Sequence, residues 1–238
     1  AGRFAVHPPR SAAARAKWIG ANPGRFSYPQ PPDFTGTSFL KQIALELAPD
    51  RSVFMMPAET ADKDAALGPL WQWLETVHPD LWRGGTSYPA NYTDMVQLLG
   101  DGELSFAMAF NPAEFSNGIA SGVLPETVRS YIHQGGTLAN VHFVAIPFNA
   151  SASEAARVTA DFLLSPEAQL RKVRADIWGD PTVLAMHRLP QDMQKAFTRV
   201  VRGPATLSEA ELGRTLPEPH PSWVAVIEEG WNRRFLLR

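Results

Sequence analysis

The sequence predicts an α/β fold, and three features of the chain support this prediction. Residues 104–110 and residues 141–146 are continuous apolar runs of strand length, as expected of parallel strands that are covered on both faces. Residues 62–77 carry apolar side chains at helical spacing. Because segments of the two kinds alternate along the chain, we expect a mostly parallel sheet with helices packed against it.

The first half of the chain has clear start and stop signals. Its predicted elements are a helix over residues 8–21, a short strand over 25–28, a polar turn over 33–38, and helices over 39–47 and 62–77. Ser11 is a candidate N-cap for the first helix, and Asn22, Pro23 and Gly24 end it. The apolar face of the last helix is formed by Leu67, Leu70, Trp71 and Leu74.

The second half alternates in the same way. Its predicted elements are a loop over residues 88–94, a helix over 95–99, a buried strand over 104–110, a helix over 114–119, a buried strand over 140–146, helices over 154–164 and from 165 onward, and a closing helix over 223–236. Pro166 suits the first turn of a helix, because its missing N–H would have no partner there.

Composition and charge narrow the functional classes. The 238 residues, 45% apolar and 19% charged, suffice for one large or two small folded domains. The net charge of −2 is spread without a dense basic face, so we expect no nucleic-acid partner. The chain has no cysteine, which excludes disulfides and thiolate metal sites. No apolar run approaches the roughly 20 residues of a membrane span. The first residues do not resemble a signal peptide, so an exported protein would carry its signal outside this chain.

No constellation of catalytic residues is evident. The chain lacks a G-x-S-x-G nucleophile elbow, a P-loop and a G-x-G-x-x-G dinucleotide fingerprint. Its six histidines include no pair at the i, i+4 spacing that places two metal ligands on one helix face. We therefore expect no enzymatic activity, no cofactor and no metal. His142 lies among apolar neighbours in a predicted strand, and two interpretations stay open: a histidine satisfied in the core or at a strand end, or one that faces a cleft.

Two polar segments lie where α/β proteins bind ligands. Residues 33–38 and residues 111–114 each follow a predicted strand and open a helix. Ligands of open α/β sheets bind outside the carboxyl ends of the strands, where helix N-termini present free N–H groups and a partial positive charge. We therefore predict that the two segments border one cleft. The alternative is that Asp33 and Thr35 belong to an ordinary helix cap with no ligand nearby.

A set of short motifs resembles one protein family. The motifs are N-P-G-R-F-S-Y-P at residues 22–29, P-D-F-T-G at 32–36, N-P-A-E-F-S-N-G-I at 111–119, G-G-T at 135–137, N-V-H-F-V-A-I-P-F-N at 140–149, F-L-L-S-P-E-A-Q at 162–169 and W-G-D-P-T-V-L at 178–184. In this order they resemble the solute-binding proteins of bacterial ABC importers, in the family associated with thiamine transport. L-S-P-E-A-Q alone is widespread among solute-binding proteins, so the ordered set carries the resemblance.

The resemblance implies a periplasmic-binding-protein-like type II fold with two α/β lobes and a hinge. It implies a hinge-proximal segment over residues 1–19, the second lobe over 20–138, and a return to the first lobe with C-terminal helices over 139–238. The N-terminal part of the first lobe would be missing. The implied function is capture of a small molecule in the cleft between the lobes of a periplasmic or other extracytoplasmic monomer. The implied membrane partner is the permease of an ABC importer.

The ligand that the resemblance implies is thiamine or a related compound. Thiamine is a cation with an aromatic ring, so its pocket should offer carboxylates and aromatic faces. The residues expected to line the site are Tyr28, Asp33, Thr35, Gly36, Thr37, Tyr88, Asn111, Glu114, Asn140, His142 and Trp178. Among them, Asp33 and Glu114 are the carboxylates expected to pair with a cation, whereas an anionic ligand would use the helix N-termini.

Two other functional classes stay open. An enzyme on the same type of fold would need a clustered acid–base pair or a catalytic lysine, and none of the five lysines lies in a motif of that kind. A ligand-sensing domain of a transcription regulator would need a DNA-binding helix-turn-helix outside this chain.

Overall fold

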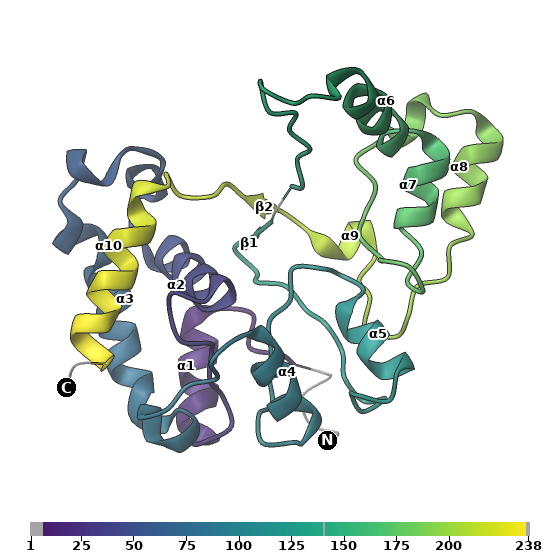
Figure 1. Cartoon of the computed structure of the whole chain (residues 1–238). Coiled ribbons are helices and arrows are strands. Elements are labelled where there is room, and N and C mark those ends of the chain that lie inside the picture. The colour runs from purple at the N-terminus through teal and green to yellow at the C-terminus, as the bar shows by residue number, and fades with distance from the viewer. Residues whose placement is uncertain (1–6, 140, 237–238) are drawn as a thin grey trace. The chain divides into compact units, whose positions relative to one another are not determined.

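The computed structural model describes residues 7–139 and 141–236, and the chain divides into two compact units. Unit 1 consists of Ala1–Ala109, Tyr131–Ala139 and Glu209–Arg238, and unit 2 consists of Phe110–Ser130 and Asn140–Ser208. The backbone therefore passes between the units four times (Figure 1). Within the described ranges, none of the helices combines the length and the apolar character that a membrane span requires.

Unit 1 is built mainly from helices. Its elements are α1 (Ala12–Ala21), α2 (Phe34–Leu47), the 3₁₀ helices η1 (Arg51–Met55) and η2 (Ala58–Thr60), α3 (Lys63–Val77), η3 (His78–Asp80), η4 (Trp82–Gly85), α4 (Tyr92–Gly100), β1 (Thr137–Leu138), α9 (Glu209–Leu212), β2 (Thr215–Leu216), α10 (Ser222–Trp231) and the π-helical turn η6 (Asn232–Leu236). Helices α1, α2, α3 and α10 pack against one another (Figure 1). The helices predicted in these regions are confirmed, with ends that differ by up to five residues.

Helix α2 lies at the centre of the core of unit 1. All of its residues from 35 to 45 are buried. The helix begins at Phe34, because the Asp33 side chain accepts the N–H groups of Thr35 and Gly36 at 2.8 and 3.1 Å. The turn predicted over residues 33–38 is therefore wrong in part, since these residues form the cap and first turn of α2.

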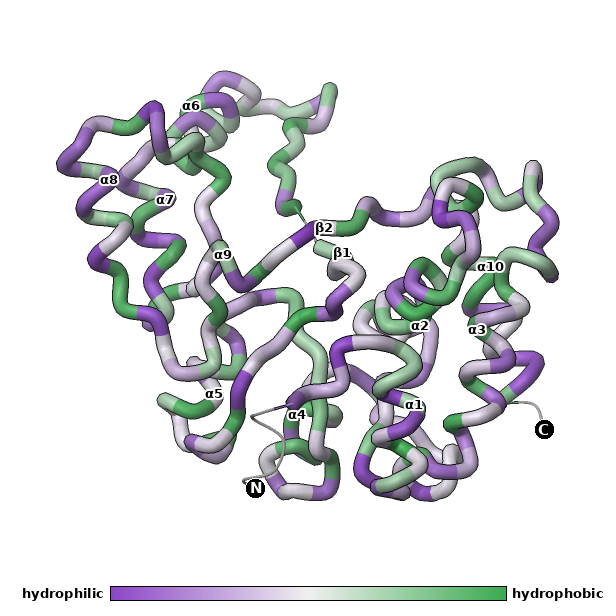
Figure 2. The backbone as a smooth tube through the Cα atoms, turned by 180° about the vertical axis from the view of Figure 1, so that it is seen from behind, coloured by the Kyte–Doolittle hydropathy of each residue, from purple (hydrophilic) through white to green (hydrophobic). Residues whose placement is uncertain are grey.

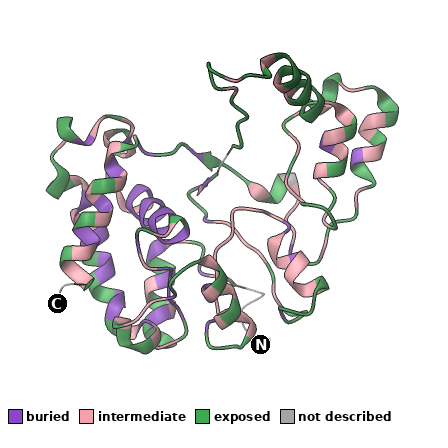
Figure 3. Cartoon of the chain, in the orientation of Figure 1, coloured by how far each residue is buried: buried purple, intermediate pink, exposed green. Residues whose placement is uncertain are grey.

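The neighbouring helices bury the faces that their sequences predict. In α3, the predicted apolar residues Leu67, Leu70, Trp71 and Leu74 are all buried. Ser11 caps α1 by accepting the N–H of Ala14 at 3.1 Å, which confirms its predicted role. Figure 3 shows that buried residues are concentrated along α1, α2, α3 and α10.

A small parallel sheet completes unit 1. Strands β1 and β2 pair in parallel, with Leu138 opposite Leu216, and no other regular strand occurs in the part of the chain that the structure describes. Gln42 joins α2 to this sheet, because its Nε2 donates to the Gly136 carbonyl at 3.0 Å and its Oε1 accepts the Leu138 N–H at 2.8 Å. The fold is therefore of a mixed α/β class in which helices predominate.

Unit 2 has shorter helices and few buried side chains. Its elements are α5 (Glu114–Ala120), α6 (Ser153–Leu163), α7 (Pro166–Lys172), the 3₁₀ helix η5 (Met186–Arg188) and α8 (Gln191–Thr198). Helix α7 packs against both α6 and α8, and Ser165 caps it by accepting the Ala168 N–H at 3.2 Å. The predicted helices over 114–119, 154–164 and from 165 are confirmed. Exposed residues predominate along α6, whereas α7 and α8 each have a single buried residue (Figure 3).

The predicted strands are wrong. Residues 25–28 and 104–110 meet at one hydrogen bond, from the Ser105 N–H to the Arg25 carbonyl at 2.8 Å, but they form no ladder. Of residues 104–110, only Leu104 is buried. Residues 141–146 are irregular, and five of the six are exposed instead of buried. A strand needs a neighbour for its backbone groups, and the described residues offer none to this segment.

The boundaries of the predicted lobes differ from those of the two compact units. Residues 7–19 belong to the same unit as residues 20–109, whereas residues 110–130 belong to unit 2. The range 139–238 contributes to both units. The assignment of these ranges to the two lobes of a binding protein stays a prediction.

Candidate functional site

The predicted binding residues are distributed over both units. Unit 1 holds Tyr28, Asp33, Thr35, Gly36, Thr37 and Tyr88, and unit 2 holds Asn111, Glu114, His142 and Trp178. Asn140 lies outside the described residues. The cleft predicted between residues 33–38 and residues 111–114 thus concerns segments of different units, and it stays a prediction.

The N-terminus of α2 is occupied by contacts within unit 1. Asp33 caps the helix, as the alternative interpretation of this segment states. The Thr37 hydroxyl donates to Glu228 Oε1 at 2.7 Å. A side chain at Gly36 would overlap the Pro29 carbonyl oxygen, so the backbone at residues 29–30 lies directly on this turn. Thr35, Gly36 and Thr37 are consequently buried.

Tyr28 belongs to a buried hydrogen-bonded network. Its hydroxyl accepts the Trp231 Nε1–H at 2.9 Å and lies 2.6 Å from His78 Nε2. The Tyr28 proton is therefore directed at Nε2, which places the imidazole proton on Nδ1. Burial raises the pKa of Tyr28 well above its ordinary value, so the phenol stays neutral. Tyr28 contacts other side chains of unit 1 and has no open surface.

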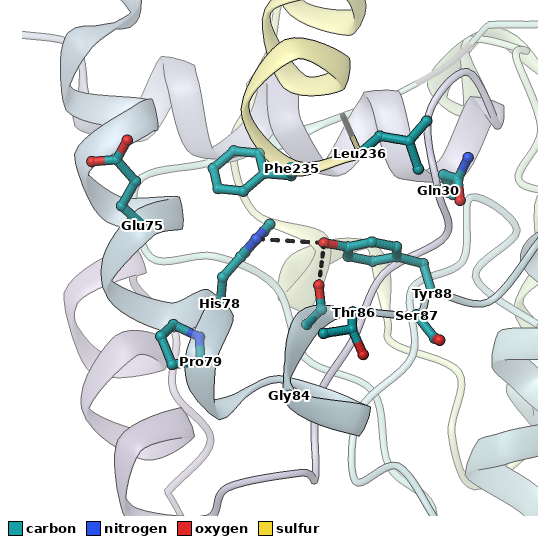
Figure 4. Close-up of a pocket in the computed structure, with 11 residues that line it drawn as sticks. Gln30, Glu75, His78, Pro79, Gly84, Thr86, Ser87, Tyr88, Phe235 and Leu236 are labelled. Carbon is teal, nitrogen blue, oxygen red and sulfur yellow. Dashed lines mark hydrogen bonds between the residues drawn. The ribbon is translucent and has the colours of Figure 1, made fainter. Parts of the chain in front are cut away.

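Tyr88 connects this network to a pocket of unit 1. Its hydroxyl donates to the Gly85 carbonyl at 2.7 Å and lies 3.5 Å from His78 Nδ1. Burial raises the pKa of Tyr88 to about 12. The pocket has a volume of about 670 Å³ and is lined by Gln30, Glu75, His78, Pro79, Gly84, Gly85, Thr86, Ser87, Tyr88, Phe235 and Leu236. Figure 4 shows Phe235 next to His78, with ring centroids 3.9 Å apart, as an apolar wall.

In unit 2, three predicted residues from distant parts of the sequence come together. The ring centroids of His142 and Trp178 lie 5.4 Å apart. Asn111 donates from Nδ2 to the Trp178 carbonyl at 2.8 Å and accepts the Ala113 N–H at 2.9 Å. Trp178 is 44% exposed, so part of its indole is open to solvent. The exposed position of His142 contradicts the interpretation of a core histidine.

Two charged residues complete the surroundings of this indole. Lys172 Nζ lies 2.8 Å from Asp180 Oδ2 and 5.4 Å from the centroid of the Trp178 ring. Asp180 Oδ2 is also 4.0 Å from His142 Nε2. The Lys172 and Asp180 side chains are only 14% and 15% exposed, which holds the pair in place. We name Asn111, His142, Lys172, Trp178 and Asp180 the Trp178 cluster.

Local backbone geometry positions the Trp178 cluster. Helix α7 ends at Lys172, and the chain folds back so that the Gly179 N–H donates to the Lys172 carbonyl at 2.9 Å. Gly179 has a φ of 81°, and a side chain there would overlap that of Ala113. Only glycine suits this position. The turn thereby places Trp178 and Asp180 beside residues 111–113.

Lys172, Asp180 and His78 were not predicted as site residues. Asp180 lies inside the motif W-G-D-P-T, which was the one available signal. Lys172 comes from the preceding helix, and His78 belongs to none of the motifs and to no pair with metal-ligand spacing. Glu114 lies in the first turn of α5, and within the described residues no hydrogen bond or ion pair joins it to the Trp178 cluster.

The Trp178 cluster offers an aromatic face together with polar and charged groups. Aromatic faces bind rings and cations, and the carboxylate, ammonium and imidazole around Trp178 offer polar contacts. No group of three or more His, Asp or Glu that could hold a metal ion occurs in residues 7–139 and 141–236.

One curated protein with a similar sequence is Protein YnjB of Escherichia coli (strain K12). The two chains are 42% identical over 228 residues, which is 96% of this chain and 57% of YnjB. The chain thus spans little more than half the length of this relative. No family model and no solved structure matches the chain.

Proposed function

We propose that this chain is part of the extracytoplasmic solute-binding component of an ABC importer, with a type II binding-protein fold. In this proposal it captures a small molecule without altering it and delivers it to a membrane permease. The Trp178 cluster is the observation that supports the proposal. Asn111, His142 and Trp178 were predicted as binding residues from segments far apart in sequence. In unit 2, Asn111 and His142 both lie beside the half-exposed Trp178.

The cluster favours a ligand with a flat ring. The open part of the Trp178 indole offers a surface for stacking, and a ring or cation over an indole gains roughly 0.5–2 kcal/mol. The exposed His142 imidazole can donate or accept a hydrogen bond at the edge of such a ring. Binding groups of this kind orient a ligand in a pocket.

Asp180 replaces Asp33 and Glu114 as the carboxylate that we assign to a cationic ligand such as thiamine. Asp180 lies beside the Trp178 ring, whereas Asp33 uses its oxygen as the cap of α2. Lys172 already neutralises Asp180, so a cation gains less than it would from an unpaired carboxylate. We therefore expect the indole to contribute more to affinity than the carboxylate.

Calorimetric titration of the purified chain with thiamine tests this proposal. We expect Trp178→Ala to weaken binding roughly 3- to 30-fold, the loss of one aromatic contact. Phe148→Ala is the matched control, because Phe148 is a fully exposed aromatic residue of unit 2; it should leave the affinity unchanged.

The possible outcomes test the identity of the ligand and the location of the binding site separately. Because the chain is proposed to be part of a binding protein, absence of thiamine binding by both the parent chain and full-length YnjB would remove thiamine as the ligand. Equal affinities of the parent and Trp178→Ala would remove the Trp178 cluster as the site. Conversion of the ligand during the titration would contradict a binding protein and support the enzyme alternative.

A further inference from the structure

Exposed apolar side chains are concentrated in unit 2. Of the 16 large apolar residues that are exposed in the described ranges, 13 belong to unit 2. Seven of the 13 lie in two neighbouring stretches of sequence, residues 141–148 and helix α6, where Val158 and Phe162 are exposed one turn apart. Single exposed apolar residues are ordinary, but such a concentration marks a surface that binds another partner.

Residues 141–146 are the most unusual part of this surface. Val141, Phe143 and Val144 are 62%, 87% and 64% exposed. In an extended chain Val141 and Phe143 point to one face and Val144 and Ile146 to the other, which His142 shares, so both faces are mainly apolar. Figure 2 shows the hydrophobic colour along the trace that leads to α6. A run of this kind is typical of a strand inside a sheet with cover on both faces.

The backbone of this segment is also unpaired. No hydrogen bond joins the N–H or carbonyl groups of residues 141–146 to any other part of the chain that the structure describes. Extended residues with free backbone groups and β-branched or aromatic side chains are suited to accept an added strand. The occupant of this surface is therefore itself an extended polypeptide segment with apolar side chains.

We propose that residues 141–146 become a β-strand by pairing with a further polypeptide segment, which corresponds to the part of YnjB outside the matched region. The match covers 57% of YnjB, so the relative has a large additional segment available for this role. A second copy of this chain is a poorer occupant. Two copies of residues 141–146 would form a two-stranded sheet, which is marginal alone and leaves both apolar faces uncovered.

Hydrogen exchange of two intact proteins tests the proposal. In this 238-residue chain the amides of residues 141–146 should exchange almost as fast as in an unfolded peptide. In full-length YnjB the aligned amides should exchange at least about a hundredfold more slowly, because a ladder hydrogen bond must open first. Protection already present in this chain, or absence of protection in YnjB, would overturn the proposal.

Paired substitutions provide a second readout. Phe143→Lys in this chain should change Tm by less than about 1 °C, whereas the aligned substitution in YnjB should lower Tm by at least about 5 °C. Met56→Lys is the control, since Met56 is an exposed large apolar residue of unit 1; it should be nearly neutral in both proteins. Equal effects of the Phe143 substitution in the two proteins would contradict the proposal. So would a stable homodimer of this chain that Phe143→Lys dissociates, because the second copy would then be the occupant.

Discussion

The two units of this chain bury their apolar residues very differently. Of the 29 apolar residues that are buried in the described ranges, 25 belong to unit 1 and four to unit 2. The exposed large apolar residues show the opposite distribution, with three in unit 1 and 13 in unit 2. Unit 1 therefore has a core of its own. Unit 2 is also rich in apolar residues, but few of those that the structure describes are buried.

Because of this difference, we expect aromatic residues of unit 1 to contribute mainly to stability and Trp178 of unit 2 to contribute mainly to ligand binding. The tyrosines predicted to bind a ligand in unit 1 belong to a buried network or to its edge, where their hydroxyls bind His78 and backbone. In unit 2 the corresponding aromatic residue, Trp178, remains half-exposed. Equivalent substitutions in the two units should therefore have unequal effects.

The largest difference is expected for tryptophan. Trp223 of α10 is fully buried, packs against Phe54 with ring centroids 4.8 Å apart, and donates to the Met56 carbonyl at 3.0 Å. Trp223→Ala should lower the free energy of unfolding by about 3–5 kcal/mol. Trp178→Ala should lower it by less than about 1 kcal/mol. Urea unfolding measures both, and similar losses would show that unit 2 is as well packed as unit 1.

The next effect concerns the buried tyrosine. Tyr28→Phe removes the partner of both Trp231 Nε1 and His78 Nε2, so it should cost about 1–3 kcal/mol of unfolding free energy. Tyr88→Phe removes a hydroxyl at the edge of the pocket, where water can replace it, and should cost less than about 1 kcal/mol. If Tyr88→Phe proves the more destabilising, the network does not depend on Tyr28.

A buried charge network makes unit 1 sensitive to acid. His133 lies between Glu46, whose Oε2 is 2.7 Å from Nδ1, and Arg15, whose Nη2 is 3.1 Å from Nε2. Because the guanidinium donates to Nε2, the imidazole is neutral and donates from Nδ1 to Glu46. Burial, helped by the charge of Arg15, lowers the pKa of His133 despite Glu46. Burial alone would raise the pKa of Glu46, but the hydrogen bonds from His133 and Ala12 and the charge of Arg15 lower it.

Both shifts predict lower stability in acid. In the unfolded chain His133 is protonated near pH 6.5, whereas its pKa in the folded chain is lower. The unfolded state therefore binds a proton more readily, and the free energy of unfolding decreases as the pH falls below about 6.5. Protonation of Glu46 adds a further loss at lower pH. Urea unfolding at pH 7.5 and pH 5.5 measures the first loss, and His133→Gln should reduce it. If His133→Gln shows the same difference in unfolding free energy between pH 7.5 and pH 5.5, other groups cause the acid sensitivity.

The smallest difference is expected for helix caps. Asp33→Ala removes the cap of α2 in the core of unit 1 and should cost about 0.5–2 kcal/mol, whereas Asp33→Asn retains a good cap and should cost little. Ser165→Ala removes the equivalent cap of α7. Helix α7 belongs to unit 2, whose side chains are poorly buried. Ser165→Ala should therefore lower the free energy of unfolding by less than Asp33→Ala does. The same urea experiment compares them.

Local signals predicted the helices correctly. The spacing of Leu67, Leu70, Trp71 and Leu74 determines the buried face of α3, and Ser11 and Ser165 determine where two helices begin. The start of α2 was misplaced, although Asp33 is a good cap residue, because the following Thr35 and Gly36 are common in turns. These features depend on residues that are close in sequence.

Features that depend on distant partners were predicted less well. Residues 141–146 have the composition of a buried strand, but a strand forms only where a neighbour supplies backbone partners, and sequence alone does not reveal whether one is present. His78 was missed because its hydrogen-bond partner Tyr28 lies 50 residues away in sequence. Asn111, His142 and Trp178 were expected in the site because motifs of a known family contain them.

Residue-resolved hydrogen exchange of this chain tests the contrast between the units most directly. The amides of α2 should exchange only through global unfolding of unit 1, because residues 35–45 are buried throughout. The amides of α6 should exchange at least about a hundredfold faster, since none of its residues is buried. This result would support a self-sufficient unit 1 and an incomplete unit 2. Equal protection of α2 and α6 would contradict it.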